Sequence, residues 1–501
     1  MDRIKRLITL LEQRGMQPNF LINLEDTSSH ESRLYFMVRD EAILSDKDAV
    51  QELYGKQLNA VPTSYRMLKS RVKKKLFNQL HLLNLHDKNF GERKQMRLEA
   101  ESLQYRASIL FNLDEYDLVI ELVEKVLQIA KEYDFYDLQL NATDLLKGVY
   151  YYKKDIKKLS FYTDVAERLK DIVLAEREAQ SISRKFRLES GYFVDNRYEL
   201  LSKIEEAISR LKELWERNRT YRTFEYYYLV QIQLYEQQGD FTSVIEFTKY
   251  ADKLVADGMV NKNIFDRSMN IFLCVYAHLR AELYDKGLEL AAQALPLYDK
   301  HSGNWFAHME NYILLALYKQ DYTLASNLIE QVNKNKFSQS LPELVKERWC
   351  LINAFIDLVT KHTVSSKLLD ELKEASYISK DKQGFYVYVN VLEFMYLLFN
   401  HQTSDVFETY IDRYRKYAAR YLKNDKVERI KIFYKLMTLA LREAFDYEKC
   451  AAKGEALFQK LKVTKAPGEA YAEVEIVPYE HLWELALDIM KQRHQDSVAE
   501  A

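Results

Sequence analysis

Glycine and proline are rare in this chain, with 12 glycines and 6 prolines among 501 residues. Their usual frequencies in proteins are near 7% and 5%. Both residue types mark turns and interrupt helices, so a chain this poor in them has little room for tight β-turns or for glycine-lined loops. Hydrophobic residues make up 48% and charged residues 30%, a balance typical of a folded protein. The sequence therefore predicts an all-α fold with more than about 70% helix, far above the average share.

A recurring helical hairpin organises the sequence. In each copy an apolar helix is followed by a polar turn and by an aromatic residue that opens a second apolar helix. The clearest copies are centred on Tyr116, Phe241, Tyr284, Tyr322 and Tyr447. Weaker copies fill the two long gaps between them, at Ile156, Tyr198, Val364 and Val406. The mean period is about 41 residues, and periods of about 20–50 residues are typical of arrays whose units bury their apolar faces against one another.

These hairpins resemble tetratricopeptide-type repeats, in the variety with longer helices. The turn pairs Asp240-Phe241, Asp321-Tyr322 and Asp446-Tyr447 match the pair that closes the turn in that family. Small residues follow where the two helices of a repeat cross, at Gly287, Ala325, Cys450, Ala251 and Ala294. The period is longer than the family's usual 34 residues or so, and the closing proline is missing. The resemblance implies an α-solenoid of antiparallel helical hairpins.

Three regions follow from this pattern: an irregular helical N-terminal cap over 1–95, the repeat array over 96–465, and a loop with a C-terminal helix over 466–501. Within the cap, Ser45 and Asp48 form a capping-box-like start for a helix through Tyr54. Residues 63–85 follow as a long amphipathic helix with one apolar face. The first 20 residues also read as an amphipathic helix, without the features of a signal peptide.

Motifs that carry chemistry are missing from the sequence. The glycines lie too far apart for a phosphate-binding loop or for the elbow that holds a nucleophilic serine. The ten histidines form no metal-binding cluster with the cysteines. The three cysteines are Cys274, Cys350 and Cys450. Cys274 and Cys450 are expected to be buried and unpaired, as in a protein of the reducing cytoplasm. We therefore expect no catalytic residues, no cofactor, no metal and a cytoplasmic location.

The charges are nearly balanced, with a net charge of −2 at pH 7. No apolar run is long enough to span a membrane. The basic helix at 63–85 leaves open a nucleic-acid-associated role. A second basic run, 409–435, contains Tyr410, Tyr414, Tyr417 and Tyr421. At 100° per residue these tyrosines share one helical face, and most of the cations lie on the other. We therefore interpret the tyrosines as packing residues and the cations as solvated.

The leading hypothesis is a non-catalytic scaffold or adaptor that binds a protein or peptide on the concave surface of the array. In tetratricopeptide-type arrays the first helix of each hairpin lines that surface. This implies partner-binding residues at Gln104, Ser108, Tyr226, Gln233, Tyr276, Arg280, Asn311, Lys435 and Arg442. The first alternative is a regulatory or nucleic-acid-associated protein that uses the helix at 63–85, and the second is an enzyme with an unrecognised site. Exposed array ends would also allow homo-oligomers.

Overall fold

The computed structural model describes residues 22, 26–42, 45–55, 61–79, 91–192, 197–378, 385–400, 406–422, 428–464 and 475–500. Helix makes up 84% of these residues, and none of them lies in a strand. The all-α prediction is confirmed. None of the helices in the described ranges combines the length with the apolar composition needed to cross a membrane. The chain forms two compact units, Met1–Glu178 (unit 1) and Ala179–Ala501 (unit 2).

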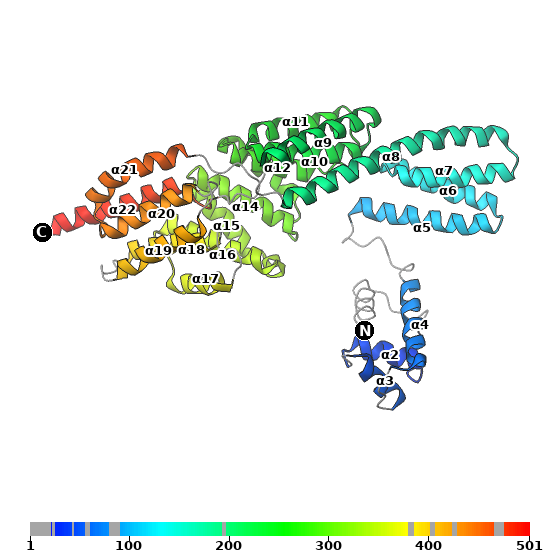
Figure 1. The fold of residues 1–501 in the computed structure, drawn as a ribbon, viewed down its shortest axis with the longest axis horizontal. Coiled ribbons are helices and arrows are strands. Elements are labelled where there is room, and N and C mark those ends of the chain that lie inside the picture. Colours follow the sequence, from blue (N-terminus) through cyan, green and yellow to red (C-terminus); the bar gives the residue numbers. More distant parts are fainter. Residues whose placement is uncertain are drawn as a thin grey trace. The chain divides into compact units, whose positions relative to one another are not determined.

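The described part of unit 1 begins with three helices: α2 (His30–Arg39), α3 (Asp46–Tyr54) and α4 (Thr63–Gln79) (Figure 1). Their small core includes Leu68, Val72 and Leu76, which form the apolar face predicted for this helix. The predicted capping box at the start of α3 is confirmed, because the Ser45 hydroxyl accepts from the Asp48 amide and the Asp48 carboxylate accepts from the Ser45 amide. The part of the predicted helix beyond residue 79, and the first 20 residues, lie outside the described ranges.

Four longer helices complete unit 1: α5 (Glu92–Asn112), α6 (Tyr116–Glu132), α7 (Tyr136–Tyr152) and α8 (Ile156–Tyr192). The helix α6 packs against both α5 and α7, and α5 also contacts α7 (Figure 1). The helix α8 continues past Glu178 into unit 2 as one uninterrupted helix of 37 residues. The segment KDIVLAEREAQSISRKF in its middle contains no glycine, proline or asparagine, so nothing local ends the helix there.

Unit 2 is held together by one large apolar core, which gathers side chains from α12 to the C-terminal helix. The fully buried side chains of Trp305 and Trp483 belong to it. Its α-helices, after α8, are α9 (Arg197–Asn218), α10 (Tyr221–Gln238), α11 (Phe241–Ala256), α12 (Arg267–Arg280), α13 (Tyr284–Ala294), α14 (Gly303–Tyr318), α15 (Tyr322–Lys334), α16 (Glu343–Lys361), α17 (Ser366–Ile378), α18 (Phe385–Phe399), α19 (Phe407–Tyr421), α20 (Glu428–Arg442), α21 (Tyr447–Val463) and α22 (Tyr479–Glu500). Two short 3-10 helices, Leu295–Leu297 and Lys336–Ser340, follow α13 and α15.

One turn geometry recurs in both units. In each case the residue two positions before a helix has a left-handed backbone, with φ between 53° and 73°. These residues are Asp114, Asp134, Lys154, Arg219, Gly239, Glu282, Gln320 and Phe445. The helices that follow begin at Tyr116, Tyr136, Ile156, Tyr221, Phe241, Tyr284, Tyr322 and Tyr447. The five clearest repeat centres of the sequence are therefore first residues of helices.

The aspartate of the predicted turn pairs caps the helix that follows. The carboxylates of Asp240, Asp321 and Asp446 each accept a hydrogen bond from the backbone amide three residues later, at 2.9–3.0 Å. Such a cap satisfies one of the four amides that a helix start leaves without an intrahelical partner. The turn pair therefore sets where α11, α15 and α21 begin.

Small residues allow close helix crossings at the positions expected from the sequence. Gly287 of α13 faces α14, and a Cβ at this position would lie 2.7 Å from Cδ2 of Leu315. The other predicted small residues, Ala251, Ala294, Ala325 and Cys450, are all buried. Cys274 is also buried and, like Cys450, unpaired, as predicted. The predicted small residues therefore allow the second helix of a hairpin to pack closely against a neighbouring helix.

Candidate partner-binding surface

Two of the predicted partner-binding residues, Tyr276 and Arg280, lie one turn apart on α12. Both contact Phe241 at the start of α11. The Tyr276 ring meets Phe241 edge-on at 5.9 Å, and the Arg280 guanidinium lies 5.0 Å from the centre of the Phe241 ring. Both residues remain partly exposed. The hydroxyl oxygen of Tyr276, however, is buried and has no hydrogen-bond partner. The helix α12 therefore presents a cation and an aromatic ring side by side.

Glu236, at the end of α10, lies near this pair. Burial raises the pKa of the Glu236 carboxyl to about 7, even though the charge of Arg280 acts in the opposite direction. Glu236 is still partly exposed to solvent. A carboxyl that solvent reaches but cannot fully hydrate must be surrounded by protein on several sides. The end of α10 and the end of α12 therefore form a recessed polar position.

Two tyrosines from the next helices extend this position. The rings of Tyr284 (α13) and Tyr318 (α14) are 5.8 Å apart. Burial raises the pKa of both, that of Tyr284 to about 12, although both side chains stay partly exposed. The helices α12 and α14, which carry Arg280 and Tyr318 in their last turns, pack against each other. We call Glu236, Tyr276, Arg280, Tyr284 and Tyr318 the recessed surface.

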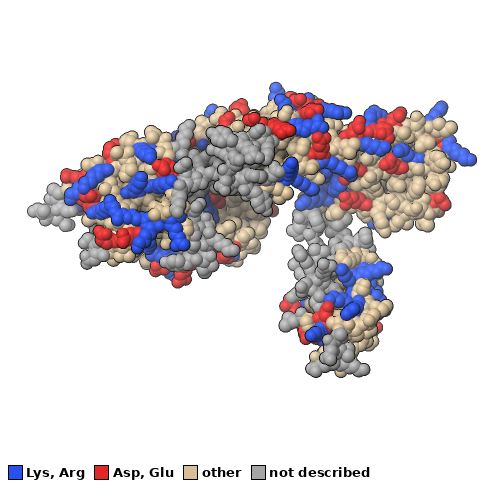
Figure 2. All heavy atoms as spheres, viewed as in Figure 1, with Lys and Arg blue, Asp and Glu red and all other residues tan. Residues whose placement is uncertain are grey.

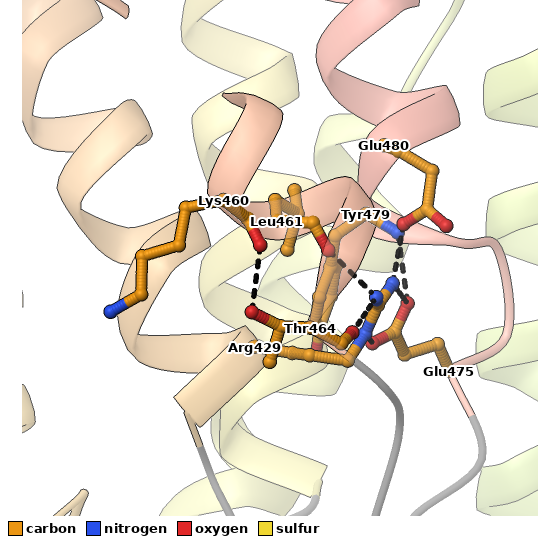
Figure 3. Close-up of polar contacts among 7 residues, drawn as sticks. All are labelled: Arg429, Lys460, Leu461, Thr464, Glu475, Tyr479 and Glu480. Carbon is orange, nitrogen blue, oxygen red and sulfur yellow. Dashed lines mark hydrogen bonds and ion pairs between the residues drawn. The ribbon is translucent and has the colours of Figure 1, made fainter. Parts of the chain in front are cut away.

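An arginine on α20, Arg429, makes polar contacts with residues of the C-terminal helices (Figure 3). The charges of Arg429 and Glu475 act on both Tyr284 and Tyr318. Arg429 and Glu475 form a two-point ion pair, with Nε to Oε1 at 2.6 Å and Nη2 to Oε2 at 3.0 Å. Nη2 also contacts the carboxylate of Glu480.

The remaining two donors of Arg429 bind the end of α21. Nη1 donates to the carbonyl oxygen of Leu461 at 3.1 Å and to that of Thr464 at 2.7 Å. Glu475 in turn accepts the backbone amide of Tyr479 at 2.9 Å, at the start of α22. All five N–H groups of the guanidinium are thus used. We call Arg429, Glu475 and Glu480 the arginine clamp, because it ties the end of α21 to the start of α22.

The arginine clamp is buried, and its energetics follow from that. Burial alone would lower the pKa of Arg429, but the hydrogen bonds and charges of Glu475 and Glu480 raise it above its usual range. Burial raises the pKa of Glu475, and the nearby Glu480 carboxylate adds to this effect. Sequence reasoning missed these residues. A signal was present, since Arg429 shares the buried stripe of α20 with Ile432, Phe433 and Leu436, where a charge needs a partner.

The other predicted partner-binding residues have different surroundings. Tyr226 is half-buried, and its hydroxyl accepts a hydrogen bond from Gln180 at 2.9 Å. Gln233 of α10 is partly exposed, whereas Asn311 of α14 is buried with 8% exposure. Lys435 and Arg442 are exposed on α20.

Gln104 and Ser108 belong to α5 of unit 1. The Ser108 hydroxyl donates to the Gln104 carbonyl oxygen at 3.0 Å, and the side-chain oxygen of Gln104 is buried without a partner. Of the nine predicted residues, only Tyr276 and Arg280 belong to the recessed surface.

The basic helix α4 is largely paired with acidic residues of its own small domain. The Lys69 ammonium lies 2.7 Å from the Asp46 carboxylate. Arg71 and Lys75 both pair with Glu31 of α2. Three of the cations that could contact phosphate are therefore partly neutralised.

The tyrosine-rich helix α19 follows the packing interpretation. Tyr414 and Tyr417 are buried, and Tyr410 and Tyr421 pack against the core. The cations Arg415, Lys416 and Arg420 are exposed. Two arginines nevertheless lie over rings of the same helix, Arg413 over Tyr410 at 4.6 Å and Arg420 over Tyr421 at 5.3 Å, so the separation of rings and cations is incomplete.

Metal-binding and nucleophilic groupings are not evident in the part of the chain that the structure describes. No three His, Cys, Asp or Glu side chains there lie close enough together to hold a metal ion. The buried His308 donates from Nε2 to the Ala291 carbonyl oxygen at 2.9 Å, and the Cys274 Sγ lies 3.7 Å from Nδ1 of His278. Burial raises the pKa of the Cys274 thiol, which keeps it protonated and unreactive.

Comparison with protein-family models, with curated proteins and with solved structures gives no match.

Proposed function

We propose that this protein is a non-catalytic helical-repeat scaffold, a tetratricopeptide-like α-solenoid that binds a protein or peptide partner at the recessed surface of unit 2. The recurring turn supports a repeat array, because the same backbone geometry and the same aromatic helix start return from α6 to α21. Solenoids of this kind use their curvature to form extended binding surfaces. The proposed array works without a cofactor or metal.

The observation that carries this proposal is the partial exposure of strongly dehydrated polar groups at the recessed surface. Glu236, Arg280 and Tyr318 are reached by solvent, yet burial shifts the pKa of Glu236 and Tyr318. Polar groups that are only partly hydrated make few hydrogen bonds to water. A partner that supplies hydrogen bonds at such a site therefore contributes more binding free energy than it would at a fully hydrated site. Tyrosine and arginine are also the residue types that most often anchor protein interfaces.

The nucleic-acid alternative has less support. Lys69, Arg71 and Lys75 pair with carboxylates of α2 and α3, so fewer charges are left on α4 to neutralise phosphates. A generic duplex or single strand that bound the protein with a steep salt dependence would favour this alternative over the scaffold.

The proposal can be tested by replacing anchors without disturbing the fold. Partners are first identified by cross-linking mass spectrometry in the native cell, and binding is then measured with purified components. Arg280→Ala combined with Tyr276→Ala, the two predicted residues of the recessed surface, should weaken binding by about thirtyfold, the equivalent of about 2 kcal/mol. Helicity and melting temperature should stay nearly unchanged.

Two controls separate the readings of this experiment. Arg267→Ala removes an exposed arginine from the first turn of the same helix, α12, and should leave binding unchanged. Lys73→Glu with Lys74→Glu should also have little effect. A larger loss from the lysine pair than from Arg280 and Tyr276 would overturn the proposal in favour of the basic helix.

A further inference from the structure

The helix α4 carries charge of one sign. It contains six lysines and arginines and no acidic residue. Two carboxylates, one from α2 and one from α3, pair with three of these cations. The other three, Arg66, Lys73 and Lys74, have no ion-pair partner among the described residues. Six cations against two carboxylates leave a clear positive excess on this helix.

The other acidic residues of the small domain do not remove this excess. Asp26, Asp40 and Asp48 each accept hydrogen bonds from residues of their own turns. Glu41 and Glu52 lie just after α2 and on α3. In the face that Figure 2 draws, Lys and Arg side chains lie over α4 together with uncharged side chains. The positive charge therefore stays concentrated on one helix.

The three unpaired cations share one side of α4 with two exposed apolar side chains. Met67 is 62% exposed and Phe77 is 46% exposed. At 100° per residue, an arc of about 120° holds all five residues: Arg66, Met67, Lys73, Lys74 and Phe77. The core of the small domain takes the opposite side of the helix. We call these five residues the α4 face.

We propose that the α4 face binds an anionic membrane surface, with α4 lying in the plane of the interface. Met67 and Phe77 then enter the boundary between headgroups and acyl chains, and the three cations contact the negative headgroups. The flexible stems of the lysines let their charges reach the headgroups while neighbouring apolar groups go deeper. The face extends over about 17 Å of helix, so it binds at the surface and does not cross the membrane.

The same residues fit nucleic acid less well. A strand that is bound by stacking needs free aromatic rings beside the cations. The Lys73 ammonium lies 5.5 Å from the centre of the Phe77 ring and covers one face of it. Met67, the most exposed apolar side chain of α4, has no ring on which a base could stack. Lipid gives both apolar side chains a favourable environment, whereas a phosphate backbone uses only the cations.

A second copy of the chain is also a poor occupant of this face. A symmetric dimer would place two α4 faces opposite each other, and their unpaired cations would repel. The inference is independent of the recessed surface, which belongs to unit 2.

The test measures co-sedimentation of the full-length chain with vesicles of phosphatidylcholine, either pure or with about one third phosphatidylserine. Binding to the phosphatidylserine vesicles should be at least about tenfold tighter and should weaken as salt is raised. Lys73→Glu with Lys74→Glu should reduce this affinity at least about tenfold. Met67→Ser with Phe77→Ser, which leaves the charge unchanged, should reduce it about tenfold.

Matched controls in unit 2 keep the test specific. Lys253→Glu with Lys262→Glu reverses two exposed lysines, and Leu344→Ser with Val463→Ser removes apolar side chains that are 70% and 77% exposed. Both variants should keep full affinity for the vesicles. The variant with Lys73→Glu and Lys74→Glu should in turn keep its affinity for the partner of the recessed surface, so the two sites can be tested separately.

Several results would overturn the inference. One is equal binding to both kinds of vesicle, and another is full affinity after Met67→Ser with Phe77→Ser. A generic nucleic-acid strand or duplex that binds more tightly than the vesicles, and is released by Lys73→Glu with Lys74→Glu, would assign the face to nucleic acid instead. A lipid-free dimer, or a bound protein, that the same lysine variant releases would assign it to that partner.

Discussion

The helix α5 of unit 1 and the helix α14 of unit 2 show how differently the two units use the same kind of helix. Of the 21 residues of α5 only Ala100 and Ala107 are buried. Of the 16 residues of α14, eleven are buried, among them Trp305 and Phe306. The turns that join the helices are alike in both units. The difference therefore lies in the side chains between the turns, which serve a large core in unit 2 and leave apolar groups on the surface of unit 1.

The two units differ in where their large apolar side chains lie. Unit 2 holds all four tryptophans, three of them in the large core that runs from α12 to α22, so its stability depends on burial. Unit 1 holds most of the exposed large apolar side chains, although it is the shorter unit. Tryptophan fluorescence reports on unit 2 alone, so the two units can be followed separately in one unfolding experiment.

The largest expected effect is on the arginine clamp. Arg429→Met should lower the free energy of unfolding of unit 2 by about 3–5 kcal/mol, because it leaves the Glu475 and Glu480 carboxylates and two carbonyl oxygens without their donor. Urea unfolding followed by tryptophan fluorescence measures this loss. Lys453→Met removes an exposed pair with Glu443 and should cost less than about 1 kcal/mol. A loss below that value for Arg429→Met would show that the clamp does not stabilise unit 2.

A pair of glycine substitutions sharpens the comparison between the units. At both Gly287 and Gly148 a new Cβ would lie 2.7 Å from a side-chain carbon. At Gly287 that carbon belongs to Leu315, which is fully buried, so overpacking should lower the stability of unit 2 by about 1–3 kcal/mol. At Gly148 it belongs to the partly exposed Phe111 ring, which can move toward solvent.

Gly148→Ala should therefore leave unit 1 unchanged or slightly more stable, since alanine favours a helix over glycine by about 1 kcal/mol. Far-UV circular dichroism and amide hydrogen exchange in α5 and α7 measure this variant. Equal losses for Gly287→Ala and Gly148→Ala would mean that the two units are packed to the same degree, contrary to the comparison.

The smallest effect is expected from pH at the recessed surface. Burial raises the pKa of Glu236 from 4.5 in the unfolded chain to about 7 in the folded protein. Between pH 4.5 and pH 7 the carboxyl is therefore protonated in the folded state and ionised in the unfolded state. Stability at this site therefore falls as the pH rises from about 4.5 to 7. Glu236→Gln should stabilise unit 2 at pH 8 by about 1–2 kcal/mol and have almost no effect at pH 4. An equal difference at both pH values would contradict the raised pKa.

The helical fold and the helix starts were predictable from the sequence because they depend on local chemistry. Scarce glycine and proline indicated helix, and the aspartate–aromatic pairs predicted the first residues of α11, α15 and α21. The packing role of the α19 tyrosines followed from helical periodicity. The solenoid arrangement itself stays a prediction, as do the three-region division and the partner-binding residues that it implied.

The parts that could not be predicted depend on distant residues. The arginine clamp joins residues 46 and 51 positions apart, and Glu475 sits in a segment without a helical pattern. The continuous α8 was missed because the repeat period suggested a turn that the local residues do not provide. The turns before Tyr136 and Tyr221 were missed because both fall between the repeat centres at Tyr116, Ile156, Tyr198 and Phe241.

The recurring turn also has a mechanical consequence. Seven of the eight left-handed positions carry a residue other than glycine, which costs roughly 1 kcal/mol or more at each position but excludes the many conformations that glycine would visit. The joints between helices are therefore stiff. A molecule built in this way does not fold at a hinge when it is loaded. Deformation is instead spread over many small sliding movements between packed helices, so that each unit bends gradually along its length.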